Sequence, residues 1–172
     1  KEKNVLEEHA KVVQFVSLAG QVTGRKKLQK MVYIAKKMQF PFHEKYHFHI
    51  YGPYSEELTL RVEELCTMGF LTEQMEDKGS YVQYCYEATE KGADFSEALC
   101  EEPQNLKEVV YILNNKSARF LELVSTLLYF DELPKTEQIE KIHVVKGKLN
   151  FTEQEMEDAF ELIDMLNQYK VN

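Results

Sequence analysis

Residues 70–88 read FLTEQMEDKGSYVQYCYEA, and this stretch decides the expected fold. Residues 70–75 and 81–88 carry aromatic, β-branched and other apolar side chains in short runs, which is typical of strands. Between them, EDKGS at 76–80 favours a turn, because polar residues and a glycine allow the backbone to reverse. The stretch therefore predicts a β-hairpin with a polar tip.

Three helices are expected before this hairpin and one after it. Apolar residues recur at helical spacing over 5–18 and 24–38, and Ser55 is placed to cap a third helix. A short extended segment over 46–51 precedes that cap, and a further helix over 93–100 follows the hairpin. Three helices, a hairpin and a helix form the winged-helix arrangement. The expected fold class is mainly α (α+β), with a winged-helix-like N-terminal part that contains a two-stranded hairpin.

The C-terminal part of the chain is expected to be wholly helical. Residues 117–130 are apolar on nearly every side, which predicts a central helix buried between other elements. Thr152 and Glu155 have the spacing of a capping box at the start of the last helix. The expected domains are residues 1–102, winged-helix-like, and residues 103–172, a helical subdomain packed on them.

Composition excludes several classes of protein. With 172 residues, 44% hydrophobic content and a net charge of −8, the chain can bury a core and is not expected to be disordered. No apolar run reaches the ~20 residues that a membrane helix needs. The cysteines number three and form no CxxC pair, which argues against a disulfide scaffold and a zinc ribbon. We expect a soluble, cytoplasmic protein with no membrane partner.

Positive charge is concentrated in residues 24–50, which we call the basic island. Seven of the 21 Lys and Arg residues lie there, and Glu44 is the only acidic residue among them. Because the helix dipole disfavours cations in a first turn, three of them at 25–27 suggest a site for an anion or an acidic protein surface. The predicted partner- or anion-binding residues are Arg25, Lys26, Lys27, Lys30, Tyr33 and Lys37.

Helical periodicity predicts that much of the basic island is exposed to solvent. At 100° per residue, one side of the 24–38 helix is an apolar stripe made of Leu28, Met31, Val32, Ala35 and Met38. The opposite side carries Lys26, Lys30, Tyr33 and Lys37. Two alternatives stay open: a solvated face that only improves solubility, and neutralisation of the island by the acidic residues within 51–109.

Metal binding and catalysis find little support in the sequence. His43, His47 and His49 are close together, but no carboxylate or cysteine stands beside them at a recognised ligand spacing. Neither GxSxG, HExxH, Walker A nor GxGxxG occurs, and Cys66 lies on the apolar stripe of its helix. We therefore expect no metal, no cofactor and no catalytic residues, and the chain is not expected to be an enzyme.

The charge of the expected third helix and hairpin bears on DNA binding. A winged helix commonly places its third helix in the major groove and its hairpin tip on phosphates. Here that helix presents Glu56, Glu63 and Glu64, and the hairpin tip adds Glu76 and Asp77. Because these carboxylates would repel phosphates, this mode of nucleic-acid binding is disfavoured.

Two segments carry a resemblance to known families. GRKKLQKMVYIAKK at 24–37, followed by YHFHIYGPYSEEL at 46–58, resembles the YwgA-like proteins of bacilli over most of residues 10–100. More distantly, KLQKMVYIA with YGPYS is similar to the SocA-like (Panacea) antitoxin domain, whose pattern pairs a KLQKLLY-type helix with a YGP turn. The region after Pro103 does not match the antitoxin family.

The resemblance implies a role in regulation. The antitoxin family is implied to act by protein contact, either neutralising toxins or serving as proteolytic adaptors, and neither family implies a catalytic residue. We therefore expect a bacterial, non-enzymatic regulatory or protein-interaction module, antitoxin-like or adaptor-like, whose partner has an acidic surface. The alternative is a DNA-binding transcriptional regulator that uses the basic second helix.

Overall fold

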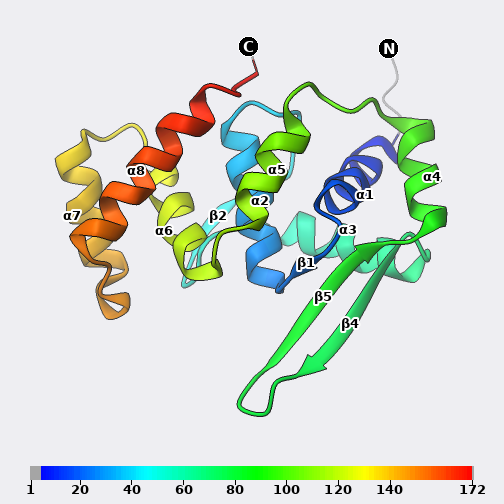
Figure 1. Cartoon of the computed structure of the whole chain (residues 1–172), viewed down its shortest axis with the longest axis horizontal. Coiled ribbons are helices and arrows are strands. Elements are labelled where there is room, and N and C mark those ends of the chain that lie inside the picture. The colour runs from blue at the N-terminus through cyan, green and yellow to red at the C-terminus, as the bar shows by residue number, and fades with distance from the viewer. Residues whose placement is uncertain (1–4, 172) are drawn as a thin grey trace.

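Helices and two small antiparallel sheets build the protein, so the fold is mainly α (α+β), as predicted (Figure 1). The computed structural model describes residues 5–171. Up to the hairpin, the elements are α1 (Glu7–Ala19), β1 (Val22–Thr23), α2 (Arg25–Lys37), β2 (His47–His49), β3 (Gly52–Tyr54), α3 (Glu56–Thr67), β4 (Leu71–Asp77) and β5 (Val82–Ala88). After it come α4 (Glu90–Leu99), α5 (Leu106–Asn114), α6 (Ala118–Tyr129), α7 (Lys135–Val145), the 3-10 helix η1 (Gly147–Leu149) and α8 (Glu153–Asn167).

The predicted hairpin is present, and it is longer than expected. Strands β4 and β5 pair as far as Asp77 with Val82, because Glu76 and Asp77 continue the strand instead of forming the turn. β1 pairs with β5, which gives the sheet order β1-β5-β4. A strand of two residues leaves no alternating pattern, so the sequence did not predict β1. In Figure 1 the hairpin projects away from the helices.

Caps place the helices on either side of the hairpin. Ser55 accepts a hydrogen bond from Leu58 N at 3.1 Å and so caps α3, as predicted. α4 begins earlier than predicted, because Thr89 caps it by accepting from Gly92 N at 2.9 Å. A Cβ on Gly92 would lie 2.0 Å from the carbonyl oxygen of Phe70, so only glycine allows α4 to pack this closely.

α2 lies at the centre of the core and is buried on more than one side. It packs against α5 and α6 as well as against β1, β3 and β5. The predicted apolar stripe is buried, but so is every residue from Leu28 to Ala35. The cause is a second layer of helices, contributed by the C-terminal part, that covers the side assigned to solvent.

The predicted central helix of the C-terminal part is confirmed as α6. It contacts α2, α7, α8 and β3, and its side chains from Leu123 to Leu128 are buried without interruption. The capping box of Thr152 and Glu155 at the start of α8 is also confirmed. One hydrophobic cluster runs through both parts of the chain, and the division after residue 102 stays a prediction.

The element order α1-β1-α2-α3-β4-β5, with β1 beside β5, is compatible with the winged-helix interpretation, which stays a prediction. The pair β2 and β3 is inserted between α2 and α3, and β2 lies in the extended segment that the sequence predicted over 46–51. Within residues 5–171, no helix combines the length and the apolar character that a membrane span requires.

Leu127→Ala tests the packing of α6. Because Leu127 is fully buried, we expect the variant to lose about 2–5 kcal/mol of unfolding free energy, as in other core truncations. The measurement is urea unfolding followed by circular dichroism. The matched control is Leu60→Ala on the exposed face of α3, for which we expect a change within about 0.5 kcal/mol. Equal losses in the two variants would contradict the assignment.

Candidate functional site

The two segments that carry the family resemblance meet at the side chain of Gln29. Its Nε2 donates to Ser55 O at 2.9 Å and to Thr59 Oγ1 at 2.9 Å, and its Oε1 accepts from Ser55 N at 2.8 Å. Gln29 and Ser55 are both buried, so these bonds satisfy polar groups that water does not reach. The amide therefore fixes α2 to the start of α3.

Gly52, in the YGPYS segment, brings β3 close to α6. Its φ of +87° is in the left-handed region, where glycine is favoured. A Cβ at this position would also lie 3.2 Å from Thr126 Oγ1. Strand β3, which leads into α3, thus contacts both α2 and α6.

A cavity of about 350 Å³ opens where these segments meet, which is within the range of small-molecule sites. Three of the predicted site residues line it: Arg25, Lys26 and Lys30. Most of the remaining lining is apolar or aromatic and comprises Leu28, Pro53, Leu58, Val62, Tyr51, Tyr54 and Tyr86. We take this cavity and its mouth as the candidate functional site.

Arg25 is exposed, as predicted, but its charge already has partners. Its Nε lies 3.4 Å from Glu73 Oε2 and donates to Tyr86 Oη at 3.2 Å, and the guanidinium carbon lies 3.8 Å from the ring centre of Tyr84. Tyr86 in turn donates a hydrogen bond to Glu73. Burial, with the Glu73 carboxylate, raises the pKa of Tyr86 above its ordinary value, so the phenol keeps its proton at neutral pH.

Lys26 is exposed, as predicted, and its ammonium lies over an aromatic ring. The Nζ atom is 3.2 Å from the ring centre of Tyr51, a geometry suited to a cation–π contact. Tyr51 is itself 47% exposed. Among residues 5–171, no carboxylate forms an ion pair with Lys26, so a positive charge and an aromatic ring remain together at the mouth of the cavity.

Lys30 is buried, so its predicted exposure is wrong. It is 2% exposed because α6 covers the side of α2 from which it extends. Burial is the main cause that lowers the pKa of Lys30 to about 8; Glu122 opposes this shift, while Lys26 and Lys146 add to it. Within the described residues the Lys30 ammonium has neither a hydrogen bond nor an ion pair.

Predicted exposure is also wrong for Tyr33. The residue is 6% exposed, and its ring packs against that of Tyr46 at 4.8 Å between centroids. Lys37 is half-buried and pairs with Asp131 Oδ2 at 2.8 Å, and Lys27 donates to Asn114 O at 2.7 Å. The C-terminal part therefore covers and partly neutralises the basic island, which periodicity within α2 alone does not reveal.

Sequence reasoning missed a buried ion pair formed by Glu44, the only acid of the basic island. Glu44 is fully buried, and its Oε2 lies 2.6 Å from Arg61 Nη1 on α3. Lys36 donates to the backbone carbonyl of Glu44. The signal that could have found this pair is the isolation of Glu44 among cations, since a buried carboxylate requires a cationic partner.

The three clustered histidines point to different partners. His43 Nδ1 lies 3.1 Å from Glu8 Oε1, the ring of His49 stacks near that of Tyr54 at 4.9 Å, and His47 is exposed. Over residues 5–171, no three His, Cys, Asp or Glu side chains are grouped so that they could hold a metal ion. Cys66 is half-buried, and burial raises the pKa of its thiol, which lowers its reactivity at neutral pH.

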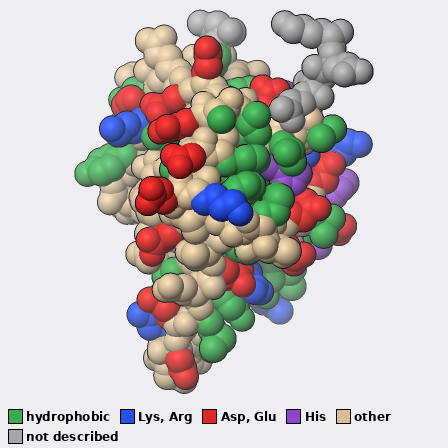
Figure 2. Space-filling view, turned by 90° about the vertical axis from the view of Figure 1, so that its right-hand side faces the viewer, with side chains coloured by type: hydrophobic (Ala, Val, Ile, Leu, Met, Phe, Trp, Pro, Cys, Tyr) green, Lys and Arg blue, Asp and Glu red, His purple; other side chains and the backbone are tan. Residues whose placement is uncertain are grey.

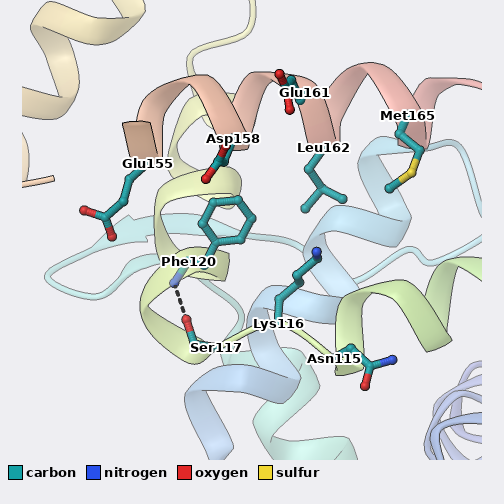
Figure 3. A pocket seen from close by; sticks show the side chains of 9 residues that line it. All are labelled: Asn115, Lys116, Ser117, Phe120, Glu155, Asp158, Glu161, Leu162 and Met165. Atoms are coloured by element: carbon teal, nitrogen blue, oxygen red, sulfur yellow. Dashed lines mark hydrogen bonds between the residues drawn. The ribbon is translucent and has the colours of Figure 1, made fainter. Parts of the chain in front are cut away.

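A second hollow, of about 730 Å³, lies between α8 and the connection from α5 to α6 (Figure 3). In Figure 3, Lys116 and Phe120 stand on one side of it, and Asp158 stands on α8. Glu155 at its edge is already engaged, since its carboxylate pairs with Arg119 at 2.9 Å and accepts from Thr152 N. Neither family segment contributes to this hollow, and we do not take it as the candidate site.

Acidic side chains cover the face formed by α4 and the hairpin. Figure 2 shows many Asp and Glu side chains there and few Lys or Arg. On α3, Glu56, Glu63 and Glu64 are exposed, as the sequence predicted. The surface that would enter a major groove in the usual winged-helix mode is thus negatively charged.

Comparisons with known proteins identify one extensive similarity. The chain is 52% identical over 164 residues to the uncharacterised protein YwgA of Bacillus subtilis (strain 168). The match covers 95% of this chain and 99% of that protein, so it extends well past the segments on which the resemblance was based. No protein-family model matches the chain.

Gln29→Met tests whether the Gln29 amide holds the site together. The change keeps the side-chain length but leaves the buried N–H of Ser55 without its partner, so we expect a loss of about 1–3 kcal/mol of unfolding free energy. The carbonyl of Ser55 keeps the bonds that it accepts from Thr59 N and Thr59 Oγ1. Urea unfolding measures it. Gln21→Met, at an exposed glutamine, is the matched control and is expected to change stability by less than about 0.5 kcal/mol. A Gln29→Met loss no larger than the control would contradict this role.

Lys30→Met tests the burial of the unpaired ammonium through pH. The folded-state pKa of about 8 lies below the unfolded value of about 10.4, so between these values the unfolded state binds more protons. Wild-type stability therefore gains from this group as pH rises from 8 to about 10. We expect Lys30→Met to be more stable than wild type by roughly 1–3 kcal/mol at pH 7, with the difference shrinking toward pH 10. Urea unfolding at both pH values measures this, and a pH-independent difference would contradict it.

Proposed function

This chain belongs to the YwgA-like family of bacterial proteins, and we propose that it is a non-enzymatic regulatory module that binds a partner protein. The antitoxin-like or adaptor-like role that the SocA-like (Panacea) resemblance implies agrees with this proposal. The cytoplasm is the proposed location. The partner is expected to present an acidic surface to the exposed cations at the start of α2.

The observation that carries the proposal is the exposure of Arg25 and Lys26 in the first turn of α2. The helix dipole disfavours cations at this position by about 0.3–1 kcal/mol each, so helix stability does not account for them. Contacts with Glu73 and Tyr86 account in part for Arg25. Lys26 has no carboxylate partner among residues 5–171, and Tyr51 extends the surface with an exposed ring. Exposed aromatic and cationic side chains are enriched where proteins bind each other.

Burial narrows the proposed contact surface to part of the predicted set. A partner can reach the exposed side chains of Arg25 and Lys26 and the half-buried side chain of Lys27. Lys30 and Tyr33 lie inside the protein, and Lys37 is paired with Asp131. A partner held by two exposed cations would associate at a rate that depends strongly on salt, because such charges act mainly on encounter. The association rate of the proposed complex is therefore expected to depend more on charge than on the surface area that is buried.

A DNA-binding regulator is the second candidate, and the winged-helix-like element order favours it. Its weakness is the acidic surface of α3, which leaves only the N-terminal end of α2 to approach phosphates. A gel shift with random duplex at 50 mM salt separates the candidates. Binding tighter than about 10⁻⁶ M that weakens steeply with added salt would favour DNA, and no shift would favour a protein partner.

Arg25→Gln/Lys26→Glu tests the proposed contact surface. Bacillus lysate is passed over immobilised wild type, a captured protein is identified by mass spectrometry, and its association with each variant is measured by surface plasmon resonance. We expect the double variant to bind that protein at least about tenfold more weakly at low salt, mainly through a slower association rate.

The control for this test carries the same change of charge elsewhere. Lys107→Gln/Lys148→Glu alters two exposed lysines on α5 and η1 and is expected to bind as wild type does. Equal weakening of binding in both double variants would mean that the net charge of the protein, and not the position of Arg25 and Lys26, causes the effect. Equal retention by wild type and Arg25→Gln/Lys26→Glu would remove Arg25 and Lys26 from the interface.

A further inference from the structure

The cavity beneath Arg25 and Lys26 contains a cation that the fold does not use. Lys30 lines the cavity and is only 2% exposed. Within the described residues, its ammonium has no hydrogen bond and no ion pair. Burying an ammonium without a partner is costly, and proteins normally pair such a group. Its presence beside an open cavity calls for an anion from outside the chain.

The nearest acid does not supply that anion. Glu122 on α6 lies close enough to influence Lys30, but its Oε2 is paired with Lys146 Nζ at 2.9 Å. Lys146 is itself 5% exposed and also donates to Ile50 O at 2.6 Å. Two buried lysines therefore face one carboxylate, and one positive charge remains uncompensated.

The acids on the other side of the cavity do not supply it either. Glu73 is held by Arg25 and Tyr86, as described above. Glu63 is exposed on α3 and forms no ion pair with Lys30. Glu63 and Glu73 also line the cavity, so the three cations of its lining, Arg25, Lys26 and Lys30, exceed its two carboxylates by one charge.

The apolar and aromatic side chains of the lining indicate what kind of molecule would fit beside the charged group of a ligand. Leu28, Leu58 and Val62 provide an apolar surface, and the rings of Tyr54 and Tyr86 provide flat contacts. Apolar walls with a few convergent polar groups are the usual composition of a site for a small organic molecule. A strongly hydrated inorganic anion would gain little from such walls.

We propose that this cavity binds a small organic carboxylate with a flat apolar body, whose carboxylate pairs with the ammonium of Lys30. A carboxylate suits the site better than a phosphate group does, because Lys30 is the one deep cation that lacks a partner among the described residues, and Arg25 is already paired. Because Lys30 is 2% exposed, this ion pair would be screened less than one on the open surface. This proposal is independent of the protein partner proposed above.

The test compares two probes that differ only in charge. 2-Naphthoate and its neutral amide, 2-naphthamide, have the same fused rings, and isothermal titration calorimetry at pH 7 measures the binding of each to the whole chain. We expect one naphthoate per chain, bound at least about tenfold more tightly than naphthamide, since an ion pair desolvated in the cavity contributes to the former alone.

Variants assign the charge preference to Lys30. Lys30→Met is expected to lose the tenfold preference for naphthoate, whereas Lys107→Met, which removes the same charge from the exposed face of α5, keeps it. Lys30→Gln serves the same purpose as Lys30→Met and gives a second measurement if either variant is poorly folded. Affinity of wild type for naphthoate is expected to fall above pH 8, where free Lys30 loses its proton.

Three results would overturn the proposal: equal affinity for naphthoate and naphthamide, unchanged naphthoate binding by both Lys30 variants, or no binding of naphthoate at millimolar concentration. None of these depends on the partner-binding test, which uses Arg25 and Lys26. Naphthoate binding by a chain that captures no protein partner would support the cavity site and count against the proposed function. Capture of a partner that requires Arg25 and Lys26, without naphthoate binding, would support the proposed function and count against the cavity site.

Discussion

The side-chain amide of Gln29 pairs with both backbone groups of Ser55, and the geometry of the candidate site depends on this contact. Without it, the buried N–H of Ser55 would have no partner, and the side-chain link between α2 and the start of α3 would be lost. Gly52 completes the arrangement, because the absence of a side chain and its left-handed backbone let β3 lie directly on α6. The cavity is lined by residues of α2, β3, α3, β4 and β5, and the Gln29 amide links α2 to α3 beside it.

The C-terminal helices do more than add a second layer to the core. Asp131, just after α6, pairs with Lys37 of α2, whereas Glu122 of α6 pairs with Lys146. On the side of α2 that the C-terminal part covers, Lys37 is therefore neutralised, while Lys30 has no ion pair among the described residues. What remains for a partner is the first turn of α2, where Arg25 and Lys26 stay exposed.

Two kinds of recognition can share this site because they use different depths of it. The mouth presents exposed charge and the ring of Tyr51, which suits a protein surface. The interior presents apolar walls and the buried ammonium of Lys30, which suits a small anionic molecule. A ligand inside the cavity would lie next to the residues that a partner would contact, so the two events can influence each other through Lys26, which borders both.

The amino-acid sequence alone determined the elements whose signals are local. The hairpin, the caps at Ser55 and Thr152 and the buried helix α6 follow from turn residues, capping side chains and an apolar pattern within a few residues of each other. Residues of both family segments line the cavity, which the sequence did not predict. Only the tertiary structure decided that Lys30 and Tyr33 are buried and that Glu44 pairs with Arg61. Periodicity shows that a helix has two sides, but whether its polar side meets water depends on elements that are distant in the chain, and here α6 covers it.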